Sequence, residues 1–281
     1  MKKSIEKLKQ AKIEEPILKS KIIISSVLGK QKEYLIINGE KDIGHEDTDT
    51  INIKIEKLIS GIPIQYITNS QEFMGLDFFV NENVLIPQPD TEILVEETIS
   101  IARTLKTPKI LDLCTGSGAI AVSLAKNIKV EKILATDISK SALNVAKINS
   151  KKNSAENIEL IESNLFENVH EKFDIIVSNP PYIETTVIET LSEEVKSEPR
   201  LALDGGKDGL DFYRNIIGES YKYLKTEGYL CLEIGYNQKE KVIKLLEKNG
   251  NYKNIYSKKD LGNNDRIIVC QKEKVCHFHQ N

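Results

Sequence analysis

The chain has 281 residues and a formal net charge of −3. Hydrophobic residues make up 40% and charged residues 29%, which is the balance of an ordinary globular protein, and the length allows one large domain or two smaller ones. These values exclude a polycationic nucleic-acid binder, a class that is rich in Lys and Arg.

Cysteine occurs at four positions, 114, 231, 270 and 276, and three of these lie in or beside apolar runs. Buried thiols in a reducing compartment are therefore expected. The lysines at the start are not followed by the apolar segment of a signal peptide, and no apolar run reaches the roughly 18 residues of a membrane-spanning helix. We expect a cytoplasmic protein with no membrane partner.

The first 75 residues are expected to be mostly helical. Residues 16–29 begin with proline and end with glycine, as helices often do, and residues 50–61 combine a possible threonine cap with a glycine stop. Residues 1–30 hold eight lysines against three acids, whereas residues 31–75 hold four against eight. Two interpretations remain open: a solvated helical bundle, or a docking domain whose basic arm meets an acidic surface or RNA.

The next segment connects this helical part to the rest of the chain. "EFMGLDFFV" (72–80) predicts a short hairpin that turns at Gly75. The proline-stiffened "IPQPD" then leads into a helix over 91–105, which Asp90 can cap.

From residue 109 onward, short apolar strands alternate with helices. The expected strands are "KILDLC", "KILATDI", "NIELIES", "FDIIVSN", "YLCLEIG", "YKNIYS" and "RIIVCQK". Such alternation predicts an α/β fold with a Rossmann-like, seven-stranded, mostly parallel sheet and helices on both faces. The last two strands have no helix between them, so we expect them to pair antiparallel.

A glycine turn in "ILDLCTGSGAIAVSLA" (110–125) is the first candidate site. Gly116 and Gly118 lack side chains where the chain must turn and a ligand must approach, and their spacing matches G-x-G-x-x-A. Asp137 ends the next strand, where a carboxylate can accept both ribose hydroxyls of an adenosine. The pattern therefore indicates either NAD or S-adenosylmethionine.

Asp112 favours S-adenosylmethionine, because a carboxylate beside the turn repels a pyrophosphate but suits the ammonium of a methionine moiety. Asn164 and Leu165 follow the third strand, where such folds usually hold the adenine. Each residue also has a purely structural interpretation. Asp112 can pair with the helix N-terminus, Asp137 can cap the next helix, and residues 164–165 can form an ordinary strand-end loop.

"SNPPYI" is the second candidate site, at the end of a strand expected beside the first one, where ligands bind in such sheets. The Asn179 side-chain oxygen can accept one N–H of a planar NH2 group, and a rigid carbonyl at Asn179 or Pro180 can accept the other. Tyr182 can lie against the face of that group. This arrangement fits methyl transfer from a sulfonium to an amide or aromatic amine. A merely rigid loop is the alternative, and His45 and His170 are expected at the surface.

The stretches "DLCTGSGAIA", "TDIS" and "SNPPYI" together resemble amino-group S-adenosylmethionine methyltransferases, and among these the release factor glutamine methyltransferases (HemK/PrmC family). The N-P-P-Y motif alone is shared with DNA and RNA base methylases. The resemblance to the glutamine enzymes is made specific by residues 61–96 and 198–216, and it extends to "LEIGYNQ" (232–238) and "KDLGNNDRIIV" (259–269).

The resemblance implies methyl transfer from S-adenosylmethionine, leaving S-adenosylhomocysteine, to the side-chain nitrogen N5 of the glutamine in the Gly-Gly-Gln motif of class 1 peptide-chain release factors. The expected partner is that protein; direct nucleic-acid binding is not expected, and neither is an oligomer. The implied domains are a helical substrate-docking domain (1–70), a hairpin linker (71–86) and a methyltransferase domain (87–281). Methylation of an exocyclic amine of DNA or RNA remains the alternative.

Motifs and resemblance together assign the site residues. Catalysis is assigned to Asn179, Pro180 and Tyr182, and glutamine binding to the same residues with Pro181. The cofactor-binding residues are expected to be Asp112, Cys114, Thr115, Gly116, Ser117, Gly118, Asp137, Leu165 and Asn179. No metal site is expected, although Cys276, His277 and His279 carry ligand types near the end of the chain.

Five positions depart from the family pattern. The family usually has glycine at Cys114, arginine at Gln88, glutamate at Asp90, an acid at Asn164 and an aromatic residue at Leu165. The Cys114 side chain is expected to narrow the turn, Gln88 removes a charge, and Leu165 weakens adenine stacking. A cofactor-binding scaffold without catalysis is therefore a third hypothesis.

Overall fold

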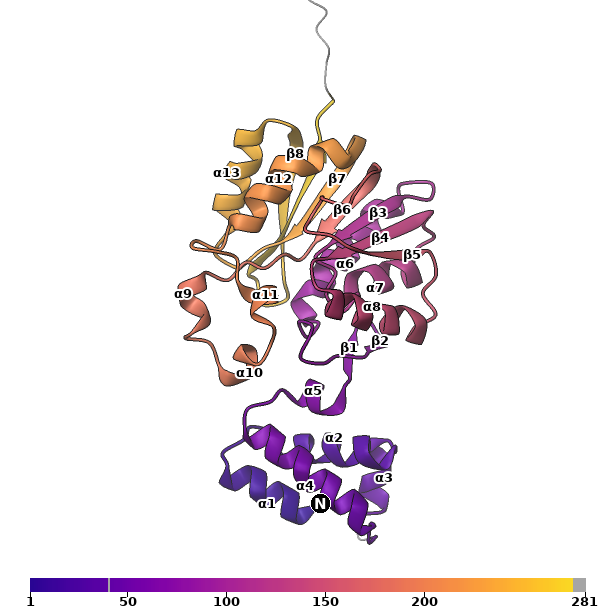
Figure 1. Ribbon diagram of the computed structural model, residues 1–281, viewed down its shortest axis with the longest axis vertical. Helices are drawn as coiled ribbons and strands as arrows, with labels where there is room; N and C mark the ends of the chain where they lie inside the picture. The colour runs from indigo at the N-terminus through magenta and orange to yellow at the C-terminus, as the bar shows by residue number, and fades with distance from the viewer. Residues whose placement is uncertain (40, 275–281) are drawn as a thin grey trace, which may run out of the picture. The chain divides into compact units, whose positions relative to one another are not determined.

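The computed structural model describes residues 1–39 and 41–274, which form two compact units (Figure 1). The first unit comprises Met1–Ser70 together with the short segment Leu191–Ser197, and the second comprises Gln71–Thr190 and the chain from Glu198 onward. The Cys and His residues at 276–279 lie outside the described residues.

The first unit is helical, as expected. Its helices are α1 (Lys2–Gln10), α2 (Pro16–Leu28), α3 (Lys32–Ile37), α4 (His45–Ile59), α5 (Ile64–Thr68) and α10 (Glu193–Lys196). Its buried core consists of Leu8, Ile23, Ile24, Leu35, Ile51, Ile55, Leu58 and Ile67. The segment around α10 joins this unit through an ion pair of 3.8 Å between Lys19 Nζ and Glu194 Oε1.

The ends of α2 and α4 test two expectations about helix caps. α2 begins at Pro16 and is followed by Gly29 with a φ of 60°, so its predicted start and stop are confirmed. The threonine cap expected for the later helix is wrong, because α4 already begins at His45 with Gly44 at its N-cap. Glu46 and Asp47 occupy its first turn, where acidic side chains favour a helix N-terminus.

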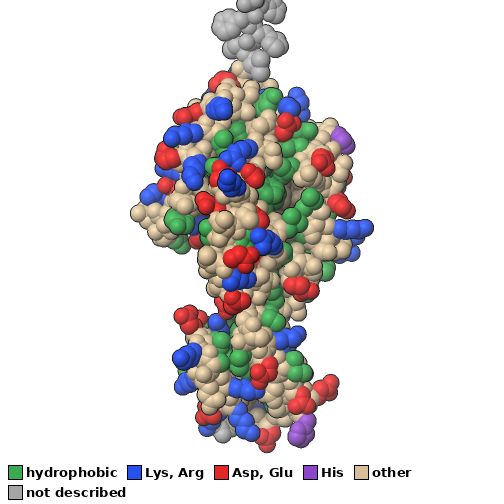
Figure 2. Space-filling view, turned by 60° about the vertical axis from the view of Figure 1, so that its left-hand side comes forward, with side chains coloured by type: hydrophobic (Ala, Val, Ile, Leu, Met, Phe, Trp, Pro, Cys, Tyr) green, Lys and Arg blue, Asp and Glu red, His purple; other side chains and the backbone are tan. Residues whose placement is uncertain are grey.

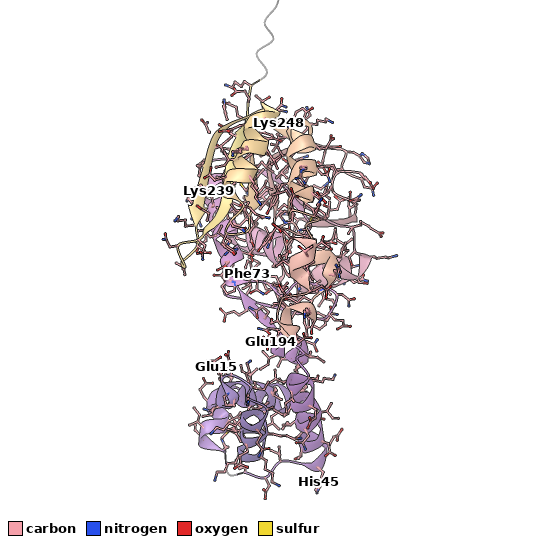
Figure 3. All side chains as sticks on the ribbon, turned by 90° about the vertical axis from the view of Figure 1, so that its left-hand side faces the viewer. Glu15, His45, Phe73, Glu194, Lys239 and Lys248 are labelled. Atoms are coloured by element: carbon pink, nitrogen blue, oxygen red, sulfur yellow. The ribbon has the colours of Figure 1, made fainter. Side chains whose placement is uncertain are left out.

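The predicted hairpin is confirmed as β1 (Gln71–Phe73) and β2 (Leu76–Phe78). Met74 and Gly75 both have positive φ, which matches the right-handed twist of the two strands. Phe73, labelled in Figure 3, and Phe78 pack edge to face with their ring centres 6.0 Å apart.

The second unit contains the predicted seven-stranded sheet, in the order β5-β4-β3-β6-β7-β9-β8. The strands are β3 (Lys109–Leu113), β4 (Lys132–Asp137), β5 (Ile158–Glu162), β6 (Phe173–Ser178), β7 (Leu224–Glu233), β8 (Tyr252–Lys259) and β9 (Asp265–Lys272). The first five in that order are parallel, and β9 runs antiparallel to both β7 and β8.

Helices cover both faces of this sheet. They are α6 (Glu92–Ala102), α7 (Ala119–Asn127), α8 (Lys140–Lys152), α12 (Asp211–Tyr223) and α13 (Lys239–Asn249), with the short η1 (Pro89–Thr91), α9 (Thr185–Ile188) and α11 (Arg200–Leu203). Successive strand residues alternate between the faces: Ile110 packs in the core under α6 and α7, and Leu111 in the core under α12 and α13. Figure 1 shows these two helix pairs on opposite sides, and Lys239 and Lys248 mark α13 in Figure 3.

The predicted α/β fold with a helical N-terminal part is thus confirmed. β6 lies directly beside β3, with Ser178 opposite Leu113. The chain order therefore reverses between these two strands, and the loops after them meet at the switch point where parallel sheets bind ligands.

Candidate active site

The turn after β3 is built from small residues and brings the backbone to the edge of a cleft. Gly116 and Gly118 have φ of 53° and 79°, which favours glycine. A Cβ on Gly118 would lie 3.1 Å from the Ala146 Cβ, so this glycine also lets α7 approach α8. A Cβ on Gly116 would meet no heavy atom within 4 Å, which leaves room for a ligand against the backbone.

Asp112 lies fully buried behind this turn. Its Oδ2 accepts a hydrogen bond of 2.6 Å from the Thr115 hydroxyl, and the backbone N–H of Ala121 in the first turn of α7 lowers the pKa of the carboxyl. Burial raises its pKa to about 7. Oδ1 has no hydrogen-bond partner among the described residues. The start of α7 thus favours the charged carboxylate, and Oδ1 stays unpaired within the described part of the chain.

Asp137 ends β4 and links two neighbouring loops. Its Oδ2 accepts a 2.8 Å bond from the Gly116 N–H, and its Oδ1 accepts a 2.8 Å bond from the Ser139 N–H. Burial raises its pKa, against the effect of these backbone donors. The cap of α8 is the Ser139 hydroxyl rather than Asp137, because that hydroxyl accepts the Ala142 N–H. The carboxylate is thus held at the cleft with lone pairs to spare.

The loop after β6 begins with Asn179 and carries the N-P-P-Y motif. Ser178, the last strand residue, donates a hydrogen bond of 2.8 Å from its hydroxyl to the Leu113 carbonyl. Pro180 and Pro181 are buried, and Asn179 and Tyr182 are half-buried. The motif is therefore fixed directly beside the glycine turn, as predicted from the strand order.

Distant segments surround this loop so closely that only glycine fits. A Cβ on Gly205 would lie 2.7 Å from the Tyr182 Cα, and one on Gly209 would lie 2.4 Å from the Tyr182 carbonyl oxygen. That carbonyl accepts a 2.9 Å bond from Gln238 Nε2, which also bonds the Gly209 carbonyl at 3.1 Å. The segments 204–209 and 232–238 thus pack against the N-P-P-Y loop and fix its conformation.

The Tyr182 hydroxyl is tied to the end of β7. It donates to Glu233 Oε1 at 3.3 Å, and burial raises the pKa of both groups, that of Glu233 to about 7. Arg266 lies nearby and pairs with Asp90 at 3.0 Å and with Asp260 at 2.9 Å. Asp90 therefore does not cap the following helix as expected: α6 has no side-chain cap, and Asp90 faces the arginine.

One cleft brings part of the predicted set together. The predicted residues that line it are Cys114, Gly116, Asp137, Leu165, Asn179 and Pro181. Asp112, Thr115, Ser117 and Pro180 are buried behind its walls, and Gly118 and Tyr182 are also absent from the lining. The remaining lining includes Ser163, Asn164, Leu201 and Phe212.

The positions that depart from the family pattern differ in how closely they approach the cleft. Cys114 has a φ of 59°, which is unfavourable for any residue with a Cβ, and burial raises the pKa of its thiol. Leu165 also has a positive φ and lines the cleft. Gln88 is exposed and donates to the Ile86 carbonyl, and it is not part of the lining. Asn164 is exposed and donates to Glu167.

Sequence reasoning overlooked several groups that build this site. Glu198 is buried with a pKa raised to about 7, and it accepts a 2.9 Å bond from the Ile86 N–H, which joins the "IPQPD" segment to "EPRLAL". Thr91, Glu233 and Gln238 were also missed. A buried acid or amide inside an apolar stretch such as "YLCLEIG" was the available signal.

Other site classes find no support in the described part of the chain. His45 and His170 are exposed, as expected, and residues 1–39 and 41–274 hold no group of metal-ligating side chains. None of the helices found there has the length and apolarity needed to cross a bilayer. On the face shown in Figure 2, Lys and Arg are interspersed with Asp and Glu rather than gathered in one patch.

Comparisons with known proteins agree with this fold. A family model of the methyltransferase small domain matches residues 89–206, and one of the PrmC N-terminal domain matches residues 1–68. A ribosomal protein L11 methylase from Lactobacillus delbrueckii subsp. bulgaricus shares the fold, with a TM-score of 0.51 and 22% identity over 69% of this chain and 84% of that one.

Curated relatives are closer. A release factor glutamine methyltransferase from Fusobacterium nucleatum subsp. nucleatum is 42% identical over 274 residues, 96% of this chain and 77% of that protein. Another, from Clostridium acetobutylicum, is 42% identical over 276 residues, 95% of each chain. The chain therefore belongs to the release factor glutamine methyltransferase family.

Proposed function

We propose that the protein transfers a methyl group from S-adenosylmethionine to the side-chain nitrogen N5 of the glutamine in the Gly-Gly-Gln motif of a class 1 peptide-chain release factor. The observation that carries this proposal is a shared cleft: Asn179 of the N-P-P-Y loop lines it together with Gly116 and Asp137. An amide acceptor and a nucleoside-bearing donor can thus be held side by side.

The donor half of the cleft fits S-adenosylmethionine on two observations. The open space above Gly116 admits a ligand against the backbone, and Asp137 presents a carboxylate suited to ribose hydroxyls. Asp112 lies behind the cleft wall with its Oδ1 unpaired among the described residues, and its negative charge would favour the ammonium. When bound, the cofactor supplies an electrophilic methyl group on a sulfonium.

The acceptor half is shaped for a planar NH2. Asn179 Oδ1 accepts one N–H, and a proline-fixed carbonyl of the loop accepts the other, so the nitrogen turns its π-face toward the methyl group. As the N–C bond forms and the C–S bond breaks, the amide nitrogen becomes acidic and releases one proton. Because a side-chain amide is not basic, orientation and exclusion of water supply most of the acceleration.

The identity of the acceptor rests on family membership. We propose that residues 1–70 help to dock the release factor, that 71–86 form a linker and that 87–281 carry the chemistry; the match of the PrmC N-terminal domain to residues 1–68 supports the first part. Methylation of a nucleic-acid base is less favoured, because the net charge is −3 and charges of both signs are interspersed on the face shown in Figure 2.

Labelled methyl transfer tests the proposal directly. Purified protein is incubated with methyl-labelled S-adenosylmethionine and either a wild-type class 1 release factor or its Gln→Ala variant in Gly-Gly-Gln. We expect label on the wild-type factor alone. Equal label on both factors would place the methyl group elsewhere, and nuclease-sensitive label in a cell extract would favour a nucleic-acid acceptor.

A further inference from the structure

Asn179 can perform the proposed task only if its amide has one of two orientations. The oxygen must face the acceptor NH2, because the amide nitrogen is itself a donor and would oppose another donor. The two orientations have almost the same shape, so packing alone does not select between them. Something polar behind the side chain must therefore decide which end faces the cleft.

Thr91 occupies that place. Asn179 Nδ2 donates to Thr91 Oγ1 at 3.2 Å, and no described residue donates to Asn179 Oδ1. Thr91 is buried and stands at the N-cap of α6, yet its hydroxyl makes no capping bond. A threonine at an N-cap normally uses its hydroxyl for the helix, so its commitment to Asn179 calls for another explanation.

Glu233 explains why the Thr91 hydroxyl serves Asn179 rather than the helix. Glu233 Oε2 is buried and has no hydrogen-bond partner among the described residues, and the neighbouring Thr91 hydroxyl lowers the pKa of this carboxyl. A carboxylate has no hydrogen to give, so Thr91 is the donor in this pair. The hydroxyl has only one hydrogen, and with that hydrogen committed its oxygen can only accept. An accepting oxygen selects the NH2 end of Asn179 and turns Oδ1 away from Thr91.

We propose that Thr91 and Glu233 are positioning residues that fix the amide orientation of Asn179, so that its oxygen meets the acceptor. The inference rests on the proposed function, since it assumes that the acceptor presents an NH2 group. It assigns to β7 and η1, which carry these two residues, a part in selecting the substrate nitrogen.

The charge of Glu233 then becomes a switch for this orientation. Once protonated, Glu233 can donate to Thr91, which frees the Thr91 hydrogen for Asn179 Oδ1 and permits the opposite orientation. Burial raises the Glu233 pKa to about 7, so kcat is expected to rise with pH through neutrality and level off above it. The titratable and charged groups that face Glu233 are Tyr182, Asp90, Arg266 and Tyr213.

The first test uses a matched pair of variants. Thr91→Val keeps the shape of the side chain but removes the hydroxyl, and Thr91→Ser restores the hydroxyl. With a release factor as acceptor, we expect Thr91→Val to lower kcat about tenfold or more, while Thr91→Ser stays within about threefold and the Kd for S-adenosylmethionine changes little in both. An unchanged kcat in Thr91→Val, or equal losses in both variants, would overturn the inference.

The pH profile separates positioning from folding. Glu233→Gln should lower kcat and abolish its rise through pH 7, measured at saturating cofactor and release factor, with thermal unfolding followed in parallel. If kcat of this variant still rises with pH as in the wild type, Glu233 does not control the orientation of Asn179. Merely structural damage would lower kcat without flattening its pH dependence.

A substrate-free measurement keeps the inference separate from the proposed function. In protein with 15N-labelled asparagine, the Asn179 side-chain NH2 protons should show cross-peaks to Thr91 protons, and these should be lost or weakened in Thr91→Val. If wild-type protein methylates no release factor but shows these cross-peaks, the proposed function fails and the orientation stands. If they are absent from wild-type protein, the orientation is wrong whatever the acceptor.

Discussion

The two loops that line the cleft are held in place in opposite ways. The turn over 114–118 bends at its own glycines and has open space above Gly116, with one bond from Asp137 as an anchor. The loop over 179–182 is held by distant parts of the chain: Gly205 and Gly209 pack closely against it, and Gln238 donates a hydrogen bond to it. A donor site can therefore be read from one short motif, whereas the acceptor site depends on segments far away in the chain.

Two glycine substitutions should show this difference between the loops most strongly. Gly209→Ala would drive a Cβ to 2.4 Å from the Tyr182 carbonyl oxygen, so we expect a loss of about 2–4 kcal/mol in the free energy of unfolding. Gly116→Ala meets no atom, so we expect only about 1 kcal/mol from its positive φ, together with weaker cofactor binding because the methyl group enters the cleft.

Denaturant unfolding measures the first effect, and a cofactor titration the second. The comparison fails if the two variants are destabilised equally, or if Gly116→Ala binds S-adenosylmethionine as tightly as the wild type.

Removing the acceptor group itself is the next largest change. Asn179→Ala should lower kcat more than about tenfold, equivalent to at least ~1.5 kcal/mol of transition-state stabilisation, because an acceptor N–H loses its oriented partner. Asn127→Ala is a suitable control, since Asn127 is exposed at the end of α7 and bonds only the Ser123 carbonyl. Wild-type turnover in Asn179→Ala would contradict the role given to the loop.

The donor side predicts a pH dependence of binding. The Asp112 pKa is raised to about 7, and an ammonium prefers the charged carboxylate. The affinity for S-adenosylmethionine should therefore rise from pH 5.5 to 7, by up to about tenfold per unit, and then level off until the cofactor's own amino group begins to lose its proton near pH 8. Asp112→Asn should flatten this rise. If the affinity of the wild type does not change with pH, Asp112 has only a structural role, through its bond to Thr115 beside α7.

Cys114→Gly should have the smallest effect, and a favourable one. Glycine relieves the strain of a φ of 59° but gains freedom in the unfolded chain, so we expect the free energy of unfolding to rise by less than about 1 kcal/mol. Removing the thiol side chain from the lining should tighten cofactor binding a few-fold. Weaker binding in this variant would mean that the side chain contributes a contact rather than an obstruction.

The contrast between the loops also explains how much could be predicted from the sequence. Period-two strands, helices and the hairpin at Gly75 follow local rules, and the order of β3 and β6 follows from the parallel fold. Thr91 looked like part of a helix start and Glu233 like the end of a buried strand. Thr91 meets Asn179 across 88 residues of chain, and Glu233 meets Tyr182 across 51, so both contacts depend on tertiary packing that no local pattern encodes.

The central claim is that Asn179 presents a glutamine side-chain amide to the methyl donor. Fragment mass spectrometry of a release factor after reaction with the wild type and with Asn179→Ala tests it most directly. The account predicts one added methyl group on the side-chain nitrogen of the Gly-Gly-Gln glutamine, formed more than about tenfold more slowly by the variant. A methyl group on any other residue, or equal rates for both proteins, would contradict it.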